Sequence, residues 1–201
     1  MSNIIELNNI SKTFDNKKKI TVLKNLNFKF KKGKIYSLSG PSGSGKSTLL
    51  NLLSLIDRPS SGSIKIDNQN INYNEIEIND KIRSNNIGIV YQEKNLLPDF
   101  TAIENVCIAS LAANNNYKMA EQESLKIIQK VGLKDRTNHY PSELSGGELQ
   151  RIAISRAIVN KPRIILADEP TGSLDHENAN QIFNLLFKLN LGSDYRLSFR
   201  L

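Results

Sequence analysis

The chain has 201 residues, which is enough for one α/β domain with a buried core but too few for two such domains or for a fused membrane domain. No apolar stretch approaches the roughly 20 residues needed to cross a bilayer, and no secretory signal opens the sequence, so we expect a cytosolic protein that reaches membranes only through partners. The net charge of +7 is compatible with nucleic acid, an anionic membrane surface or an anionic ligand, and does not choose between them.

The N-terminal part of the chain reads as strands followed by a loop and a helix. Apolar residues at 5–10 and 22–30, joined by a lysine-rich turn, predict two antiparallel strands. A third apolar run at 35–39 ends at a glycine-rich loop, and the leucines of 47–56 then predict a helix. The order strand, loop, helix indicates the start of a parallel α/β unit.

Beyond this unit, short apolar runs typical of strands are followed by apolar residues at helical spacing, and one further short apolar run follows these. We expect strands at 63–67 and 87–92, followed by helices at 103–113, 119–131 and 147–160. The run 164–167 before Asp168 is short and wholly apolar, as in a strand buried on both faces. The predicted fold is therefore α/β, with a parallel core sheet, an N-terminal antiparallel β subdomain and a helical subdomain inserted at roughly 93–160.

The glycine-rich loop fits the phosphate-binding loop pattern in full and lies in the strand-to-helix context that this pattern requires. Its glycines let backbone N–H groups converge on phosphate oxygens, and the following helix presents the positive end of its dipole to the same anion. Lys46 would reach the β and γ phosphates, and the Ser47 hydroxyl would ligate Mg²⁺. The predicted nucleotide-binding residues are Gly40, Pro41, Ser42, Gly43, Ser44, Gly45, Lys46, Ser47 and Thr48.

Two carboxylates, Asp168 and Glu169, follow the buried strand. The carboxyl end of such a strand lies at the sheet edge where the phosphate loop also lies. Asp168 would hold Mg²⁺ through water, and Glu169 would be the general base that polarises the attacking water. A carboxylate pair at a strand end can also be a simple capping feature, but the phosphate loop favours the catalytic interpretation.

The segment 144–151, LSGGELQR, resembles the signature sequence of ABC-type ATPases. Its physical role is a second anion site, because Ser145 and the N–H groups of Gly146 and Gly147 open a helix that can face a γ-phosphate. In the family this phosphate belongs to the nucleotide on the opposite subunit. The resemblance therefore implies a P-loop ATPase fold, a head-to-tail homodimer with two ATP molecules, a catalytic role for Ser145 and no nucleic acid partner.

Further positions follow from this resemblance, which covers most of the chain. Gln92 matches a glutamine that contacts Mg²⁺ and the attacking water and senses the membrane partner, and 173–175 matches a loop that crosses the dimer interface. Phe14 lies where an aromatic ring stacks on adenine, although a core phenylalanine at a strand end is an equally good interpretation of the sequence.

The amino-acid sequence is similar to that of LolD-type ATPases of bacterial lipoprotein-releasing complexes in four segments, 90–92, 96–105, 141–143 and 166–172. That similarity implies ATP hydrolysis coupled to lipoprotein release, membrane partners of the LolC/LolE kind, and a peripheral position on the cytoplasmic face of the inner membrane. MacB-type efflux ATPases and FtsE-type cell-division ATPases share much of the sequence of these segments, so both remain alternative functions. A truncated remnant that does not hydrolyse ATP is a third alternative.

The C-terminal end departs from the family pattern. A switch histidine expected after the next strand would fall immediately past Leu201, and neither His139 nor His176 has the right place. The segment 195–201 also alternates, and as a central strand it would bury two arginines. We therefore expect one ATP-binding domain over 1–201 with a truncated or frameshifted end, which binds ATP but hydrolyses it weakly or not at all.

Overall fold

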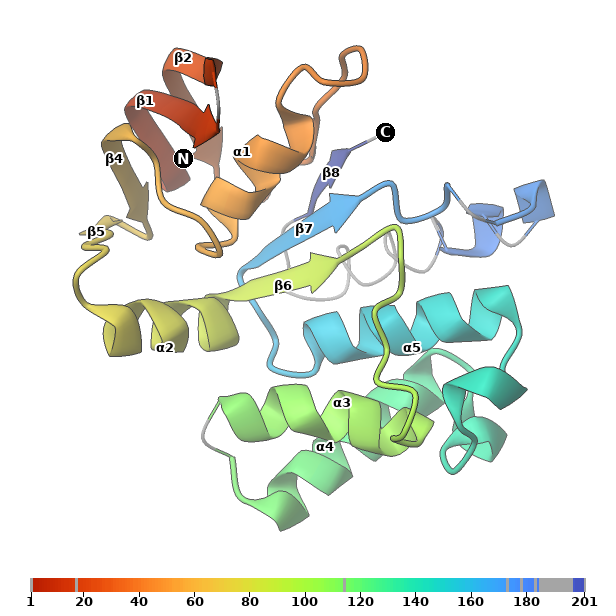
Figure 1. The fold of residues 1–201 in the computed structure, drawn as a ribbon. Helices are drawn as coiled ribbons and strands as arrows, with labels where there is room; N and C mark the ends of the chain where they lie inside the picture. The colour runs from red at the N-terminus through yellow and green to blue at the C-terminus, as the bar shows by residue number, and fades with distance from the viewer. Residues whose placement is uncertain are drawn as a thin grey trace.

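The computed structural model describes residues 2–16, 18–113, 115–172, 174–177, 179–182, 184 and 197–200 (Figure 1). Its strands are β1 (Asn3–Asn16), β2 (Lys18–Lys31), β3 (Tyr36–Ser37), β4 (Ser61–Ile66), β5 (Gln69–Asn70), β6 (Ile87–Val90), β7 (Ile164–Asp168) and β8 (Leu197–Arg200). Its helices are α1 (Lys46–Leu53), α2 (Ile76–Asn86), α3 (Ala102–Ala112), α4 (Tyr117–Lys130) and α5 (Gly146–Ile158), with 3₁₀ turns at Lys134–Arg136 and Pro141–Glu143.

The N-terminal strands form an antiparallel sheet in the order β2-β1-β4-β5, as the sequence predicts. β1 lies inside this sheet, and its Leu7 and Ile10 side chains are fully buried. β2 is the edge strand and is exposed along most of its length, and it carries several of the early lysines. Charged residues on an edge strand discourage pairing with other chains.

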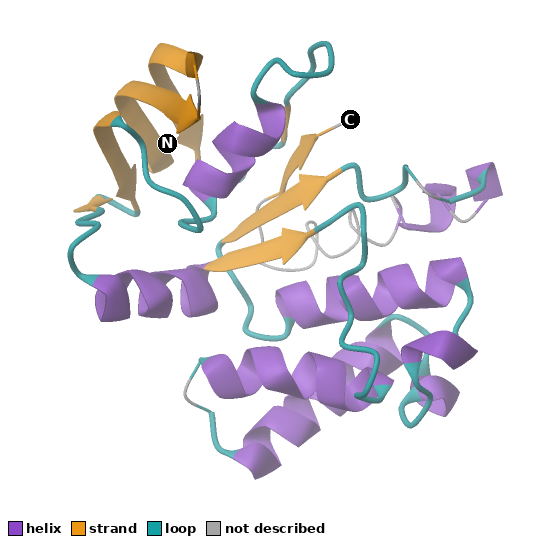
Figure 2. Ribbon diagram, in the orientation of Figure 1, coloured by secondary structure: helices purple, strands orange, loops and turns teal. Residues whose placement is uncertain are grey.

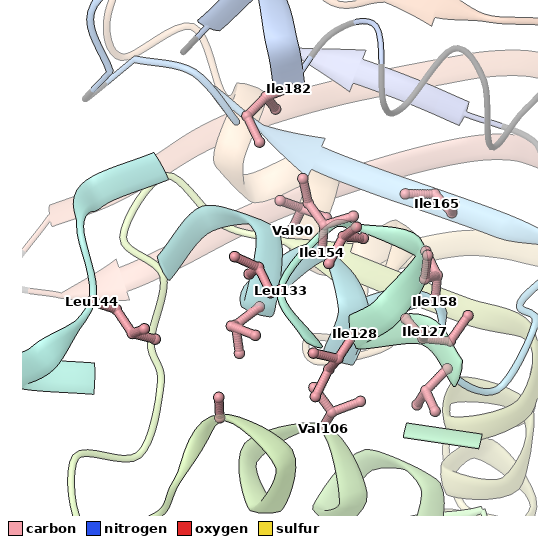
Figure 3. Packing of buried hydrophobic residues seen from close by; sticks show 14 of the residues in the cluster. Val90, Val106, Ile127, Ile128, Leu133, Leu144, Ile154, Ile158, Ile165 and Ile182 are labelled. Atoms are coloured by element: carbon pink, nitrogen blue, oxygen red, sulfur yellow. The ribbon is translucent and has the colours of Figure 1, made fainter. Parts of the chain in front are cut away.

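A second sheet, in the order β3-β8-β7-β6, has parallel pairing throughout. β7 lies within it and is buried on both faces. Ile164 and Leu166 pack into the core shared with α1 and the antiparallel sheet, while Ala167 and Ile165 pack into the helical core. Figure 3 shows Ile165 among the residues of that helical core. Because successive side chains of a strand point to opposite faces, the continuous apolar run predicted for this strand is explained by two cores.

The helices α3, α4 and α5 form the predicted inserted subdomain, on the other side of the parallel sheet from the antiparallel sheet (Figures 1 and 2). α3 begins at a capping box in which Thr101 and Glu104 bond each other's backbone N–H groups. The subdomain core includes Val106, Ile128 and Ile154, all with no exposed surface. This packing holds α5 against β6. It therefore also positions the loops that precede and follow this helix and this strand.

The structure adds α2, which the sequence did not predict. Its Ile76 and Ile78 side chains are 69% and 51% exposed, and only Asn79 is buried, so the helix has no apolar stripe to recognise. In addition, β8 lies between β3 and β7, so its backbone occupies a central position despite its alternating sequence. Residues 185–196 and 201 lie outside the described residues, and the truncated or frameshifted end stays a prediction. None of the described helices is long and apolar enough to span a bilayer.

Candidate functional site

The helix α1 begins at Lys46 without a side-chain cap and without an acidic residue in its first turn. α3 and α5, by contrast, both begin with a complete capping box. The first N–H groups of a helix have no partner within the helix, and they form the positive end of its dipole. The start of α1 therefore suits an external anion, as the phosphate-loop motif predicts.

The glycines of the loop explain its path. A Cβ on Gly45, where φ is +90°, would lie 2.9 Å from Val22 Cγ1, so only glycine lets the loop close on β2. A Cβ on Gly43, where φ is +79°, would meet no atom within 4 Å, which leaves space beside the backbone. The Lys46 Nζ donates to the Gly40 carbonyl and, at 2.8 Å, to the Pro41 carbonyl. A phosphate oxygen would be a stronger acceptor for this ammonium than either carbonyl.

The structure brings Asp168 close to the same helix. A small cavity of about 20 Å³ is lined by Asn51 of α1 and Ser54 just after it, together with Tyr91 and Asp168. Burial raises the pKa of Tyr91, and the charge of Asp168 raises it further while Arg156 acts in the opposite direction. The carboxylate at the end of β7 therefore lies beside α1, near Asn51, and its role toward Mg²⁺ stays a prediction.

Glu169 and Gln92 come together around Gly172. A Cβ on Gly172 would lie 3.5 Å from Gln92 Nε2 and 3.5 Å from Glu169 Cβ, and the Gly172 N–H donates to the Glu169 carbonyl at 3.0 Å. Glu169 has a left-handed backbone with φ of +44°, which is unfavourable for a residue other than glycine. Such strain tends to gather at functional sites, where the surrounding structure maintains it.

Phe14 is 39% exposed, so it is not a core residue, which disfavours the alternative interpretation of this position. On β1 it pairs with Ile20 of β2, two residues from Val22, whose Cγ1 would lie 2.9 Å from a Cβ on Gly45. The Lys12 Nζ lies 5.0 Å from the centroid of the Phe14 ring and 2.6 Å from Asp57 Oδ1. A cation held on one part of the ring leaves the remaining surface available for a planar group.

The start of α5 is organised by Ser145 and Glu148. The Ser145 Oγ accepts from the Glu148 N–H at 3.3 Å, and Glu148 Oε2 accepts from the Ser145 N–H at 2.8 Å. Gly147 is buried in the first turn, and a Cβ on Gly146 would make only an ordinary 3.7 Å contact with Leu174. α5 begins on the side of the molecule toward which the ends of β6 and β7 point (Figure 1). Ser173 lies outside the described residues.

The sequence did not predict two arginines, Arg136 and Arg156, whose side chains bond the start of α5 and the loop after β6. Arg136 Nε lies 3.0 Å from Glu148 Oε1, and the Arg156 guanidinium donates to the Asn95 carbonyl at 2.7 Å and the Lys94 carbonyl at 2.9 Å. Arg156 therefore ties α5 to the loop that begins with Gln92. The serine-to-glutamate spacing could have revealed the cap at 145–148, but no pattern in the sequence indicates either arginine's partner.

The chemistry of the donor set fits a magnesium–nucleotide complex better than a metal held by protein alone. No cluster of three or more His, Cys, Asp or Glu side chains exists among the described residues. The predicted ligands are the hydroxyl of Ser47, in the first turn of α1, and the carboxylate of Asp168, which lines a cavity together with Asn51 and Ser54. Mg²⁺ commonly binds one or two such groups and completes its octahedron with phosphate oxygens and water.

Comparisons with known proteins agree with this arrangement. Residues 23–172 match the family model described as ABC transporter. The chain is 44% identical over 189 residues to the lipoprotein-releasing system ATP-binding protein LolD of Wigglesworthia glossinidia brevipalpis, covering 94% of this chain and 82% of that protein. It is 46% identical over 191 residues to LolD of Rickettsia bellii, covering 94% and 84%.

Among solved structures, the chain resembles the dimeric post-hydrolysis state of the ATP-binding cassette MJ0796 bound to ADP and phosphate. The TM-score is 0.88 at 38% identity, over 98% of this chain and 87% of that one. This confirms the predicted fold class. With a family model that matches most of its length and with these relatives, the chain belongs to the ABC transporter family of ATP-binding proteins.

Proposed function

We propose that this chain is the ATPase subunit of a bacterial lipoprotein-releasing transporter, working as a homodimer on the cytoplasmic face of the inner membrane. The convergence of the phosphate loop, the ends of β6 and β7 and the start of α5 on one side of the molecule carries the ATPase part of the proposal (Figure 1). The similarity to LolD proteins from several organisms supports lipoprotein release as the work that ATP drives.

The phosphate loop, residues 40–48, binds the nucleotide. Lys46 leaves the carbonyls of Gly40 and Pro41 and contacts the β and γ phosphates, while the N–H groups at the start of α1 bind phosphate oxygens. Phe14 stacks on adenine, a contact that needs only the exposed part of its ring. These contacts fix the nucleotide and do not by themselves break a bond.

Hydrolysis requires a water in line with the γ-phosphorus. Glu169 polarises this water as general base, and Gln92 orients it, which agrees with the position of both side chains around Gly172. The water oxygen forms a bond to phosphorus as the bond to the β–γ bridging oxygen breaks. Mg²⁺, when bound, neutralises charge on the β and γ phosphates. Ser47, Asp168 through water, and Gln92 would hold that ion.

The second half of each site comes from the other copy of the chain. The Ser145 Oγ accepts from the Glu148 N–H, and its hydroxyl, which also hydrogen-bonds the Glu148 carboxylate, would turn to donate to a γ-phosphate. The N–H groups of Gly146 and Gly147 lie at the positive end of α5 and face the same anion. ATP would therefore join two copies, each closing the nucleotide site of the other.

The membrane subunit would dock in a groove of about 460 Å³ between α2, α3 and α5. Arg83, Tyr91, Ala112 and Arg156 are among the residues that line it. Tyr91 directly precedes Gln92, and Arg156 holds the carbonyls that follow it. A segment of a LolC/LolE-like subunit seated in this groove would contact both ends of the glutamine loop, residues 92–95, so its movement would reach the attacking water.

Light scattering on a Glu169→Gln variant tests the nucleotide part of this proposal. The variant removes the base but keeps the ATP contacts, so ATP should convert monomers to dimers, and ADP should not. The same variant with Lys46→Ala should stay monomeric, because it loses the phosphate contact. A Glu169→Gln protein that binds ATP and remains monomeric would contradict the proposed shared site.

The transport part needs the membrane partner. We would co-express the chain with candidate LolC/LolE-like membrane subunits and reconstitute the complex in liposomes that contain an acylated lipoprotein. ATP should release the lipoprotein to a soluble acceptor, and Lys46→Ala should abolish release. Efflux of a small molecule, or activation of cell-wall cleavage without lipoprotein release, would instead indicate a MacB-type or FtsE-type role.

A further inference from the structure

The start of α5 carries a fixed negative charge at the place where the proposed function puts a γ-phosphate. Glu148 is the third residue of the helix, and its Oε2 accepts from the Ser145 N–H at 2.8 Å. A carboxylate and a phosphate are each favoured at a helix N-terminus, but placed there together they repel each other. A bare Glu148 would therefore weaken the site that Ser145 forms.

Arg136 supplies the missing positive charge. It belongs to the 3₁₀ turn Lys134–Arg136, and its Nε donates to Glu148 Oε1 at 3.0 Å. The two carboxylate oxygens are thus divided, one on the Ser145 N–H and one on the guanidinium. Bonds to both oxygens fix the rotation of the carboxylate, and the guanidinium balances its charge.

We infer that Arg136 is a positioning residue for the second phosphate site: by neutralising and orienting Glu148, it allows Ser145 and the first turn of α5 to receive the γ-phosphate of the partner copy. This inference rests on the proposed function, because it needs an ATP-joined dimer. It assigns a role to a residue outside the signature segment and explains how a glutamate is accommodated beside an anion.

The geometry separates this role from a purely structural one. The side chains of Arg136 and Glu148 are 46% and 24% exposed, and ion pairs with this exposure contribute little to stability. Hydrogen bonds from Ser145 and Arg136 lower the pKa of Glu148 from 4.5 to about 2, so the carboxylate is charged under all physiological conditions. Its charge must therefore be balanced whenever a phosphate approaches.

A double-mutant cycle in the Glu169→Gln background tests the inference. The measured quantity is the ATP concentration at half-maximal dimer formation, by light scattering, for the parent, Arg136→Gln, Glu148→Gln and the double variant. Arg136→Gln alone should raise this concentration about fivefold, a typical coupling for residues in one network. In the Glu148→Gln background the same substitution should change it less than about twofold, since no charge remains to balance.

Additional variants and measurements exclude other causes. Arg136→Lys keeps the charge and should recover part of the loss. Arg163→Gln removes a comparably exposed arginine that pairs with Asp67 and should change nothing. Binding of a fluorescent ATP analogue to the monomer should be the same in all variants, because the phosphate loop is untouched.

Two results would overturn the inference. An equal effect of Arg136→Gln in both Glu148 backgrounds would show that the arginine does not act through the carboxylate. If the parent forms no dimer with ATP, the proposed function fails and the inference falls with it. These outcomes are distinguishable, because the first requires a dimer in the parent and the second is its absence.

Discussion

Gly88→Ala probes how closely β6 is held against α5. A Cβ at this position would lie 2.2 Å from the Ala157 carbonyl oxygen and 3.0 Å from Pro162 Cγ. The first neighbour is backbone and cannot rotate away, so strand and helix would have to separate by about 1 Å to restore ordinary contact. The substitution therefore disturbs the packing of the parallel sheet on the helical subdomain.

The expected cost follows from this geometry. Overpacking a core typically costs about 1–3 kcal/mol, and a backbone obstacle places Gly88→Ala near the upper value. For a domain of this length, each kcal/mol lowers the melting temperature by about 2–4 °C, so we expect a decrease of roughly 6–12 °C. Thermal unfolding followed by circular dichroism, with urea unfolding as a second measurement, would provide the value.

A matched glycine separates the steric clash from backbone strain. At Gly132 φ is +78° and a Cβ would meet nothing within 4 Å, so Gly132→Ala should cost only about 1–2 kcal/mol, from the left-handed backbone. Gly88→Ala should be the more damaging substitution. If it melted within 2 °C of the parent, the close approach of β6 and α5 would be wrong.

Other substitutions test separate contacts. Phe14→Ala should raise the ATP dissociation constant by about 5- to 150-fold in equilibrium titrations while leaving the melting temperature of the apoprotein nearly unchanged, because stacking on a base is worth about 1–3 kcal/mol. The pKa of Glu148 is lower in the folded chain, so its charge stabilises the fold above pH 4.5 and this advantage is lost as the pH falls toward 2; the stability difference between the parent and Glu148→Gln in urea should shrink over that range. Arg156→Ala removes both bonds to the Lys94 and Asn95 carbonyls and should speed amide hydrogen exchange in the glutamine loop severalfold, with exchange elsewhere unaltered.

Most helices and strands that carry a strong local sequence pattern could be predicted from the sequence. The phosphate loop, the buried strand β7 and the starts of α3 and α5 carry their own signals, namely glycines, an apolar run and capping residues. α2 was not predicted, because its isoleucines face solvent. The lysine-rich segment is part of β2 and not only a turn, since pairing with β1 continues to Lys18.

The parts of the site that depend on tertiary structure could not be predicted. Arg136 meets Glu148 from an irregular turn, and Arg156 binds backbone carbonyls, which any residue could provide. Lys12 reaches Asp57 across 45 positions of the chain. No spacing rule indicates such pairs. The phosphate loop and the two carboxylates at the end of β7 were predicted from their own pattern, whereas the roles of Ser145, Gln92 and Phe14 came from the resemblance. All of these roles stay proposals.

The shared nucleotide site is the central claim, and subunit complementation tests it most directly. In the Glu169→Gln background, Lys46→Ala disables the phosphate loop, and Gly146→Asp places a carboxylate at the start of α5, where its Cβ meets only an ordinary contact. Each variant alone has no intact site. If phosphate loop and α5 come from different copies, mixing the two variants with ATP should restore one site and yield dimers with one bound ATP. If both parts came from the same copy, no mixture would restore a site, and the absence of dimers would contradict the account.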